Sequence, residues 1–248
     1  MNRPVLSPSA RALPLRHWRV WGVPTLCLLA ALAIATPERN SQLFQAINGW
    51  AARGPEFIWE WLTALGDTLT AFCILLMLSW RRADIVVAAM IAAVLATLST
   101  HLAKDLLDIP RPPLLLSDSA HVIGEVLHRG AFPSGHTATA FTLIAVLAAY
   151  VRSASALVGL LLLAVAIGLS RIAVGVHWPL DVVGGALMGW ISGIAGVQCL
   201  QFLKWQRRPL LLAGIRALLL LSACLLLLSH GNGYPQADWL EKSIALLA

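Results

Sequence analysis

Charge is the property that this sequence has least of. Asp, Glu, Lys and Arg together make up 12% of the 248 residues, whereas a soluble domain carries about 25%. Hydrophobic residues make up 58%. This composition excludes an ordinary water-soluble domain and predicts an integral membrane protein. No shift in composition, internal repeat or low-complexity linker divides the chain, so we expect one membrane domain.

Acidic residues and cysteines are also few. The 12 Asp and Glu residues are outnumbered by 18 Lys and Arg, but the basic residues form short clusters beside apolar runs, as topology signals do. We therefore expect these basic residues to contact membrane lipids and not nucleic acid. The sequence shows no sign of an obligate protein partner. The four cysteines lie inside apolar runs without metal-ligand spacing, which predicts packing residues and no disulfide: Cys27, Cys73, Cys199 and Cys224.

Long apolar runs are abundant. A membrane-spanning helix needs about 20 mostly apolar residues. Seven segments approach this length: 18–36, 66–80, 85–103, 135–151, 154–173, 180–203 and 209–229. We predict an all-α fold, a polytopic transmembrane helical bundle with a six-helix core and a seventh span at 209–229. Arg216 lies inside that last span, close enough to one end to extend its charge to the interface.

The N-terminal part has two features of its own. The first apolar run follows basic residues, as in a signal peptide, but it is longer than the usual apolar region of about 7–15 residues, so we predict a retained anchor. Segment 41–62 mixes polar and aromatic residues, which favours an amphipathic segment in the membrane interface. We thus divide the chain into an anchor and interfacial segment (1–65), a core (66–203), and an extra span with a C-terminal tail (204–248).

Orientation follows from the distribution of Lys and Arg, which is enriched on the side of the N-terminus. We predict a multi-pass membrane protein with a cytoplasmic N-terminus. Three polar islands interrupt the apolar runs: KDLLDIPRP (104–112), FPSGH (132–136) and SRIAVGVHWPLD (170–181). The first two share a loop and the third follows two crossings later, so all three should meet at the outer, periplasmic face.

The islands contain groups that suit an anion with several oxygens. Arg binds phosphate with a planar fork and Lys with a point charge, and the cations here are Lys104, Arg111 and Arg171. Ser134 is a good N-cap and Gly135 admits a ligand close to the backbone, at a helix N-terminus where anions bind readily. For each cation alone, an interfacial position facing lipid headgroups is the alternative.

The third island predicts a break between two helices. Arg171 and His177 are six residues apart and would lie on different faces of a continuous helix. We predict a break near 174–178, with Pro179 at the first position of the next helix and Asp181 in its first turn. Asp181 could then fix one ring nitrogen of His177 and leave the other as a nucleophile or base. A buried His–Asp hydrogen bond with a purely structural role is the alternative.

Together these residues resemble a known signature. Residues 104–112 read K-x-x-x-x-x-x-R-P, residues 133–136 read P-S-G-H, and residues 170–181 read S-R-x-x-x-x-x-H-x-x-x-D. This pattern resembles the three-part signature of the type 2 phosphatidic acid phosphatase superfamily, without a departure. The motifs span residues 104–181, and neither the first 65 residues nor the last span carries one.

The resemblance implies a metal-independent hydrolase of phosphomonoesters or diphosphates that needs no cofactor. It implies that His177 attacks phosphorus to form a phosphohistidine and that Asp181 orients it. His136 would protonate the leaving oxygen and then activate water. The remaining matched residues would hold the phosphate oxygens: Lys104, Arg111, Ser134, Gly135 and Arg171. No carboxylate-rich metal cage accompanies them, and Asp105 and Asp108 fit solvated loop charges.

The substrate expected from the resemblance is a lipid phosphate or diphosphate, with undecaprenyl diphosphate favoured. Phosphatidylglycerol phosphate, phosphatidic acid and lipid A phosphates stay open. So do a phosphotransferase that passes the phosphoryl group to another lipid such as lipid A, and a transporter or flippase. Apolar residues of the loop 113–131 could line an entrance for lipid tails, while its polar residues fit solvated positions more than headgroup contacts: His121, His128 and Arg129.

Overall fold

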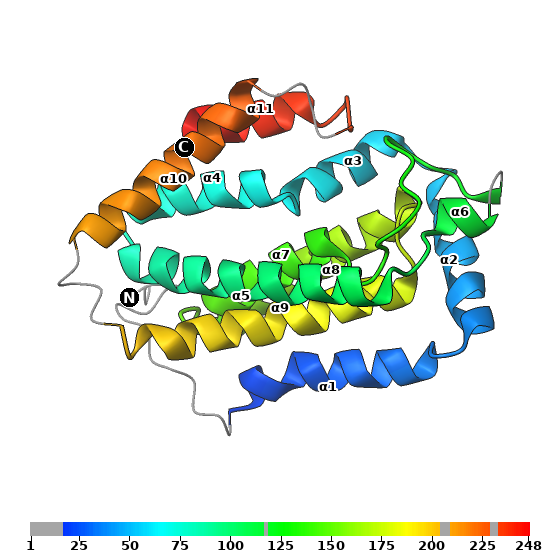
Figure 1. The fold of residues 1–248 in the computed structure, drawn as a ribbon, viewed down its shortest axis with the longest axis horizontal. Coiled ribbons are helices and arrows are strands. Elements are labelled where there is room, and N and C mark those ends of the chain that lie inside the picture. The colour runs from blue at the N-terminus through cyan, green and yellow to red at the C-terminus, as the bar shows by residue number, and fades with distance from the viewer. Residues whose placement is uncertain (1–16, 117–118, 204–208, 229–232) are drawn as a thin grey trace.

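The structure is a computed structural model, and it describes residues 17–116, 119–203, 209–228 and 233–248. Across these residues the chain forms helices and no strand (Figure 1), as the all-α prediction requires. Part of the basic charge that set the predicted orientation falls on residues 1–16 and 204–208, outside the described residues. The helices are α1 (Trp18–Ala33), α2 (Pro37–Ala51), α3 (Glu56–Leu65), α4 (Thr68–Ser79), α5 (Ala83–Leu107), α6 (Pro112–Leu116), α7 (Gly135–Ala148), α8 (Ala154–Ala173), α9 (Pro179–Leu200), α10 (Pro209–Leu228) and α11 (Asp238–Leu247).

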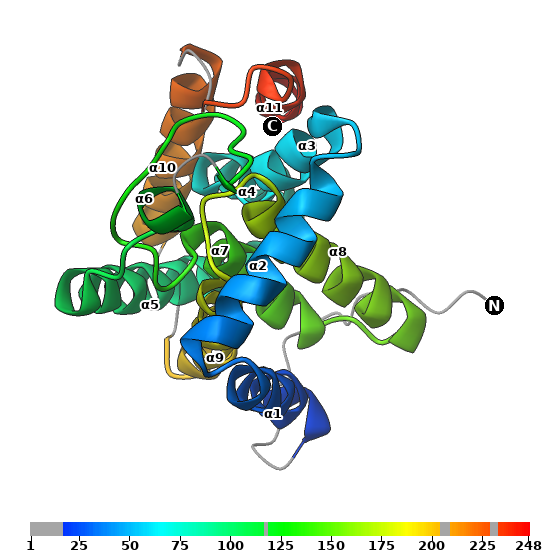
Figure 2. The ribbon, with the colours of Figure 1, turned by 90° about the vertical axis from the view of Figure 1, so that its right-hand side faces the viewer.

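The long helices run side by side along one axis, and α7 lies at their centre (Figures 1 and 2). Helices α9, α5, α8 and α4 pack around α7, while α1 lies against α9 and α10 lies against α4. Helix α2 runs across one end of this bundle, roughly perpendicular to the other helices (Figure 1). The last helix, α11, packs on α10, α4 and α3. The bundle therefore has one end that is covered by α2 and one that is not.

Glycines let the two central helices approach closely. Gly185, Gly189 and Gly193 repeat every four residues along α9 and face α7. A Cβ atom on Gly189 would collide with the backbone of Ala138, and one on Gly193 would lie 2.6 Å from the carbonyl oxygen of Thr142. Small residues at such contacts are typical of transmembrane helix packing, where van der Waals contact replaces the hydrophobic effect between helices.

The helices match the predicted spans closely. Four segments are long and apolar enough to cross a membrane: Ala83–Leu116, Ala154–Ala173, Pro179–Leu200 and Pro209–Leu228. The bent pairs α1 with α2 and α3 with α4 turn by 105° and 57°, and they raise the number to six if each pair forms one span. The remaining predicted span corresponds to α7, an apolar helix of 14 residues. These findings describe a multi-pass membrane protein.

Segment 41–62 forms two helices and not one continuous element. It is divided between α2 and α3, and both bury polar side chains inside the protein: Asn48 and Glu60 are each 2% exposed. Other side chains of α2 are exposed, among them Gln42, Gln45 and Trp50. The position of this segment in the membrane interface stays a prediction.

Arg216 and the cysteines can be compared with the predictions. The side chain of Arg216 reaches the end of α4, where its Nη2 donates to the carbonyl oxygen of Ser79 at 2.9 Å and its guanidinium lies 4.1 Å from the centre of the Trp80 ring. All four cysteines are free as predicted, but only Cys27 and Cys73 are buried; Cys199 and Cys224 are exposed on the outside of the bundle.

Candidate active site

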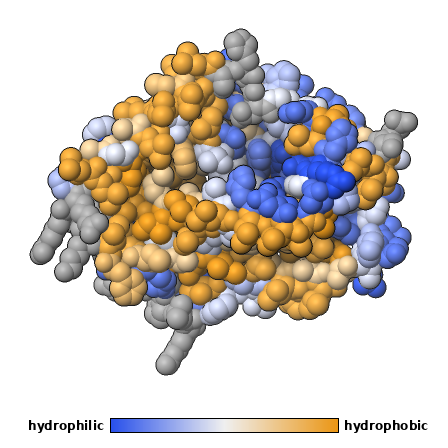
Figure 3. Space-filling model, in the orientation of Figure 1, coloured by the Kyte–Doolittle hydropathy of each residue, from blue (hydrophilic) through white to orange (hydrophobic). Residues whose placement is uncertain are grey.

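The three polar islands lie together at the end of the bundle that α2 covers. Helix α5 ends there, α7 begins there, and the turn between α8 and α9 lies between them (Figure 1). The backbone N–H of Ser134 donates to the carbonyl oxygen of Asp181 at 2.9 Å, and Nε1 of Trp178 donates to that of Pro110 at 2.8 Å. Each of these bonds joins two islands. Hydrophilic residues gather at the same end on the surface, beside hydrophobic flanks (Figure 3).

A histidine and a carboxylate form the buried centre. Helix α8 ends at Ala173 and α9 begins at Pro179, as the sequence predicted, which leaves His177 in the intervening turn. Its Nδ1 lies 3.4 Å from Oδ2 of Asp181, and the same carboxylate oxygen accepts the backbone N–H of Trp178 at 2.8 Å. His177 and Asp181 are each 2% exposed. The carboxylate thus holds the turn and orients the ring at once.

The other ring nitrogen of His177 faces a cation. Nη1 of Arg111 lies 3.5 Å from Nε2 of His177. Arg111 is itself fixed by three carbonyl oxygens: Nη1 donates to Val176 at 3.2 Å, Nε to Arg129 at 2.8 Å, and Nη2 to Gly130 at 3.2 Å. A phosphate bound next to Nε2 would therefore contact a preorganised guanidinium.

Lys104 joins this group from α5. Its Nζ donates to the carbonyl oxygen of Gly130 at 2.5 Å, which is also an acceptor for Arg111. Helix α5 continues to Leu107, so Lys104 lies in the last turn of the helix. The predicted span ended at residue 103 and placed Lys104 after the helix. The helix thus brings the ammonium next to Arg111.

Arg171 enters from the end of α8, and its partner is a residue that the sequence did not single out. Nη1 of Arg171 donates to the hydroxyl of Tyr234 at 2.9 Å. Tyr234 follows α10 by several residues and belongs to no motif. No motif or periodicity in the sequence pointed to Tyr234. The number of residues between the last span and Tyr234 does not predict which helices the C-terminal tail contacts.

The start of α7 supplies donors on the remaining side. Ser134 is the N-cap as predicted, but its hydroxyl makes no capping bond; instead it accepts the hydroxyl of Thr137 at 2.9 Å. The hydrogen on Ser134 Oγ is therefore left to donate elsewhere. No atom would lie within 4 Å of a Cβ on Gly135, so space is open beside the backbone N–H groups of the first turn. These are the features of an anion site at a helix N-terminus.

The cations also act on the acidity of His177. Burial lowers its pKa well below the usual value near 6.5, and the charges of Arg111, Arg171 and Lys104 lower it further, with a smaller effect from His136. A lower pKa keeps the imidazole neutral at pH 7. Neutral Nε2 carries a lone pair, which a nucleophile requires.

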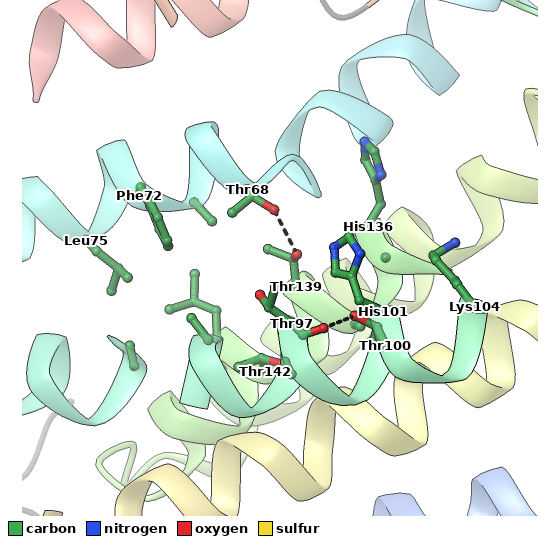
Figure 4. Close-up of a pocket in the computed structure, with 17 residues that line it drawn as sticks. Thr68, Phe72, Leu75, Thr97, Thr100, His101, Lys104, His136, Thr139 and Thr142 are labelled. Atoms are coloured by element: carbon green, nitrogen blue, oxygen red, sulfur yellow. Dashed lines mark hydrogen bonds between the residues drawn. The ribbon is translucent and has the colours of Figure 1, made fainter. Parts of the chain in front are cut away.

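His136 and Lys104 border a cavity of about 180 Å³ between α4, α5 and α7. Figure 4 shows these two residues and His101 at one end of the cavity, with Phe72 and Leu75 at the other end. Threonine side chains lie along the stretch between them: Thr68, Thr97, Thr100, Thr139 and Thr142. The cavity thus leads from the polar centre toward the apolar middle of the bundle.

Helix α2 forms hydrogen bonds to one loop near the site and to the ends of α8 and α9. Nδ2 of Asn48 donates to the carbonyl oxygens of His121, Ile172 and Ala173 at 2.8, 3.2 and 3.0 Å, and its Oδ1 accepts the backbone N–H of His121 at 2.9 Å. Oδ1 of Asn40 accepts the backbone N–H of Leu180 at 3.0 Å, in the first turn of α9. The sequence did not indicate these roles.

The loop 113–131 has mixed contacts. His128 and Arg129 are exposed, and Arg129 pairs with Asp108 at 2.6 Å. Asp105 is exposed too, but it belongs to α5 and not to a loop. His121 is not free in solvent, since its Nε2 lies 3.0 Å from Oε1 of Glu56. The start of the predicted loop is helix α6, whose Leu115 and Leu116 line an apolar cavity of about 630 Å³ together with Trp178.

Comparison with known sequences gives two findings. The sequence model of the PAP2 superfamily matches residues 82–205, half of the chain. A stretch of 69 residues is 44% identical to YbjG of Escherichia coli (strain K12), provisionally named as an undecaprenyl-diphosphatase; the match covers 27% of this chain and about a third (34%) of that relative's length.

Two solved structures resemble the fold. Aquifex aeolicus LpxE is 36% identical with a TM-score of 0.59, over 63% of this chain and 93% of LpxE. A PAP2-type phosphatidylglycerolphosphate phosphatase from Bacillus subtilis is 21% identical with a TM-score of 0.55, over 76% of this chain and 98% of its own. The second likeness is one of fold alone.

Proposed function

The chain belongs to the PAP2 superfamily, and from this premise we propose that it is an integral membrane lipid phosphatase. It would hydrolyse a lipid phosphate or diphosphate through a phosphohistidine on His177, without a metal ion. The observation that carries the proposal is the geometry of that ring, with Nδ1 3.4 Å from Asp181 and Nε2 3.5 Å from Arg111. One nitrogen is oriented by a carboxylate while the other faces the group that would hold phosphate.

In the first step, the lone pair of His177 Nε2 forms a bond to phosphorus and the bond from phosphorus to the leaving oxygen breaks. A protonated His136 gives its proton to that oxygen. Asp181 stabilises the positive charge that develops on the ring of His177. Phosphoryl transfer depends mainly on positioning and on charge around the equatorial oxygens, which the phosphate-binding residues would supply: Lys104, Arg111, Ser134, Gly135 and Arg171.

In the second step, neutral His136 takes a proton from a water molecule whose oxygen attacks phosphorus. The bond from Nε2 to phosphorus breaks, inorganic phosphate leaves, and both histidines return to their starting states. His136 suits both roles because it belongs to the first turn of α7 and borders the cavity at its polar end. His177 is held in place by Asp181 throughout.

The cavity beside His136 supports a lipid as the leaving group. The residue that protonates the leaving oxygen must lie beside the organic part of the substrate, and His136 borders a cavity that becomes apolar toward Phe72 and Leu75 (Figure 4). We favour undecaprenyl diphosphate as the substrate, which accords with the name of the Escherichia coli relative. The proposed location is the bacterial inner membrane, with a cytoplasmic N-terminus and the site on the periplasmic side.

Phosphate release by the purified protein tests the proposal. A panel of undecaprenyl diphosphate, phosphatidylglycerol phosphate, phosphatidic acid and lipid A should yield free phosphate from at least one lipid, most rapidly from undecaprenyl diphosphate, with EDTA present. A doubly phosphorylated lipid in place of free phosphate would indicate a phosphotransferase. Activity that EDTA abolishes and Mg²⁺ restores would contradict the mechanism, and no phosphate transfer from any lipid would contradict the function.

The proposed orientation has a separate test. Val126 is 50% exposed on the loop at the catalytic end. In a cysteine-free variant, Val126→Cys should react with a membrane-impermeant thiol reagent added to intact spheroplasts. Labelling only after lysis would place the site on the cytoplasmic side.

A further inference from the structure

Tyr234 lies outside the half of the chain that matches the family, yet it contacts the site. It is 7% exposed, and its hydroxyl accepts a hydrogen bond from Nη1 of Arg171 at 2.9 Å. The guanidinium carbon of Arg171 lies 5.7 Å from the centre of the Tyr234 ring. The phenol thus meets the guanidinium with both its ring and its hydroxyl.

Several contacts fix the segment that carries Tyr234. The backbone N–H of Gln236 donates to Oε2 of Glu60, and its carbonyl oxygen accepts Nε1 of Trp61, each at 2.8 Å. Both partners belong to α3, beside which the chain leading into α11 lies (Figures 1 and 2). The Tyr234 ring packs in a hydrophobic cluster with Val174 and Val176 from the turn of the third island. The backbone beside Tyr234 is therefore held by hydrogen bonds to α3, while its ring packs against the turn between α8 and α9.

The two arginines of the site differ in what holds them. Arg111 donates to three backbone carbonyl oxygens. Nη1 of Arg171 donates to the Tyr234 hydroxyl, while its buried Nε has no hydrogen-bond partner among the described residues. Burying an unsatisfied donor of a charged group is costly. That donor is the one a phosphate oxygen would satisfy once the phenol has set the plane of the guanidinium.

We propose that Tyr234 is a positioning residue that orients Arg171 toward phosphate, so that the C-terminal segment completes the binding site. The proposal rests on the proposed function in taking phosphate as the ligand. A hydrogen bond from a charged donor contributes about 10–150-fold, and because Tyr234 acts on phosphate only through Arg171, we expect a smaller effect of about 3–10-fold on phosphate binding. Tyr234→Phe should therefore weaken phosphate binding by about this factor while the ring keeps its packing.

The chain offers a matched control, because it has two tyrosines. Tyr150 is 1% exposed, and the guanidinium of Arg82 lies 5.0 Å from the centre of its ring. It follows α7 at the opposite end of the bundle, and its hydroxyl has no hydrogen-bond partner among the described residues. Tyr150→Phe removes the same atom from a similar ring, and phosphate binding should not change.

Titration calorimetry with inorganic phosphate on the full-length protein in detergent measures the effect without turnover. We expect Tyr234→Phe to raise the Kd for phosphate about 3–10-fold, and to raise KM for a lipid phosphate by a similar factor with a smaller change in kcat. In an Arg171→Met background the same change should have no further effect, because Tyr234 acts through Arg171. The melting temperature of each variant checks its fold.

An unchanged Kd for Tyr234→Phe would overturn the proposal. So would an equal loss in the presence and absence of Arg171, because that result would reflect a general effect on the fold. If the wild type binds phosphate and Tyr234→Phe weakens binding, but no lipid phosphate is hydrolysed, the positioning role stands and the proposed function fails.

Discussion

The half of the chain that matches the family and the parts that flank it contribute different things to the site. Every group proposed to touch phosphate lies within residues 82–205. The flanks contribute side chains that hold those groups in place: Asn40 and Asn48 from α2, and Tyr234 after α10. The reacting groups and the side chains that support them thus lie in different parts of the chain. Substitutions in the two regions should therefore have different effects on kcat, KM and stability.

The largest effect is expected at the nucleophile in the family half. His177→Ala removes the atom proposed to bond phosphorus, so phosphate release should fall about 10³-fold or more. Because the smaller side chain leaves the helices intact, the protein should still purify as a folded species in detergent. Phosphate release at the wild-type rate would show that His177 is not the nucleophile.

The next effect concerns the orienting carboxylate. Asp181→Asn keeps the shape and an oxygen for the Trp178 N–H, but it removes the charge that stabilises the imidazolium. We expect kcat to fall about 10²–10⁴-fold, as for an uncharged orienter of a catalytic histidine. Steady-state kinetics measures the loss, and a change confined to KM would assign Asp181 to binding.

A third change combines binding with pH dependence. Arg111→Met removes a donor that faces phosphate and should lower kcat/KM about 10²-fold. It also removes one cause of the lowered pKa of His177. Because neutral His177 is the active form, activity is lost as pH falls through that pKa.

The acid limb of the wild-type profile should therefore lie below pH 6.5, the ordinary value for histidine. The limb of Arg111→Met should lie at higher pH than that of the wild type. Identical limbs would show that Arg111 does not act on His177.

A smaller effect is expected in the flank. Asn48→Ala leaves buried backbone groups of His121, Ile172 and Ala173 without their partner. The free energy of unfolding should fall by about 1–3 kcal/mol, while kcat falls less than tenfold. Gln45→Ala, an exposed position on the same helix, should change stability by less than about 0.5 kcal/mol.

Thermal melts in detergent measure the stability of these two variants, and pH–activity profiles show whether the pKa of His177 has changed. A supporting role for Asn48 is contradicted if Asn48→Ala moves the acid limb of the profile as Arg111→Met does. It is also contradicted if Asn48→Ala loses activity without losing stability.

The smallest effect is expected at the exposed rim of the site. The side chains of Arg129 and Asp108 pair at 2.6 Å but are 66% and 54% exposed. Such pairs contribute about 0–1 kcal/mol. Arg129→Gln should therefore change activity less than about threefold, and added salt should alter wild type and variant alike. A tenfold loss of activity would show that Arg129 takes part in the site although it lies outside the buried centre.

Much of this arrangement could be predicted from the sequence. Apolar runs located the long helices, and parity placed the three islands at one end, because each crossing reverses the side. Pro179 located the start of α9 correctly. These features depend on local composition and chain order, which a single sequence contains.

The supports could not be predicted in this way. Asn48 is a polar residue in a mixed helix, and its four hydrogen-bond partners, two in a loop and two at the end of α8, are distant in sequence. Tyr234 depends on where the C-terminal tail packs against α3. Tertiary contacts without periodicity or a motif determine both positions, so they appear only in three dimensions.

In the proposed mechanism, His177 carries the phosphoryl group between lipid and water. Rapid mixing with a radiolabelled lipid phosphate, quenching in alkali and peptide mapping would detect this phosphohistidine. We expect an acid-labile, alkali-stable phosphate on the peptide that contains His177, and none in His177→Ala. A phosphate bonded to another residue, or label retained in His177→Ala, would contradict it.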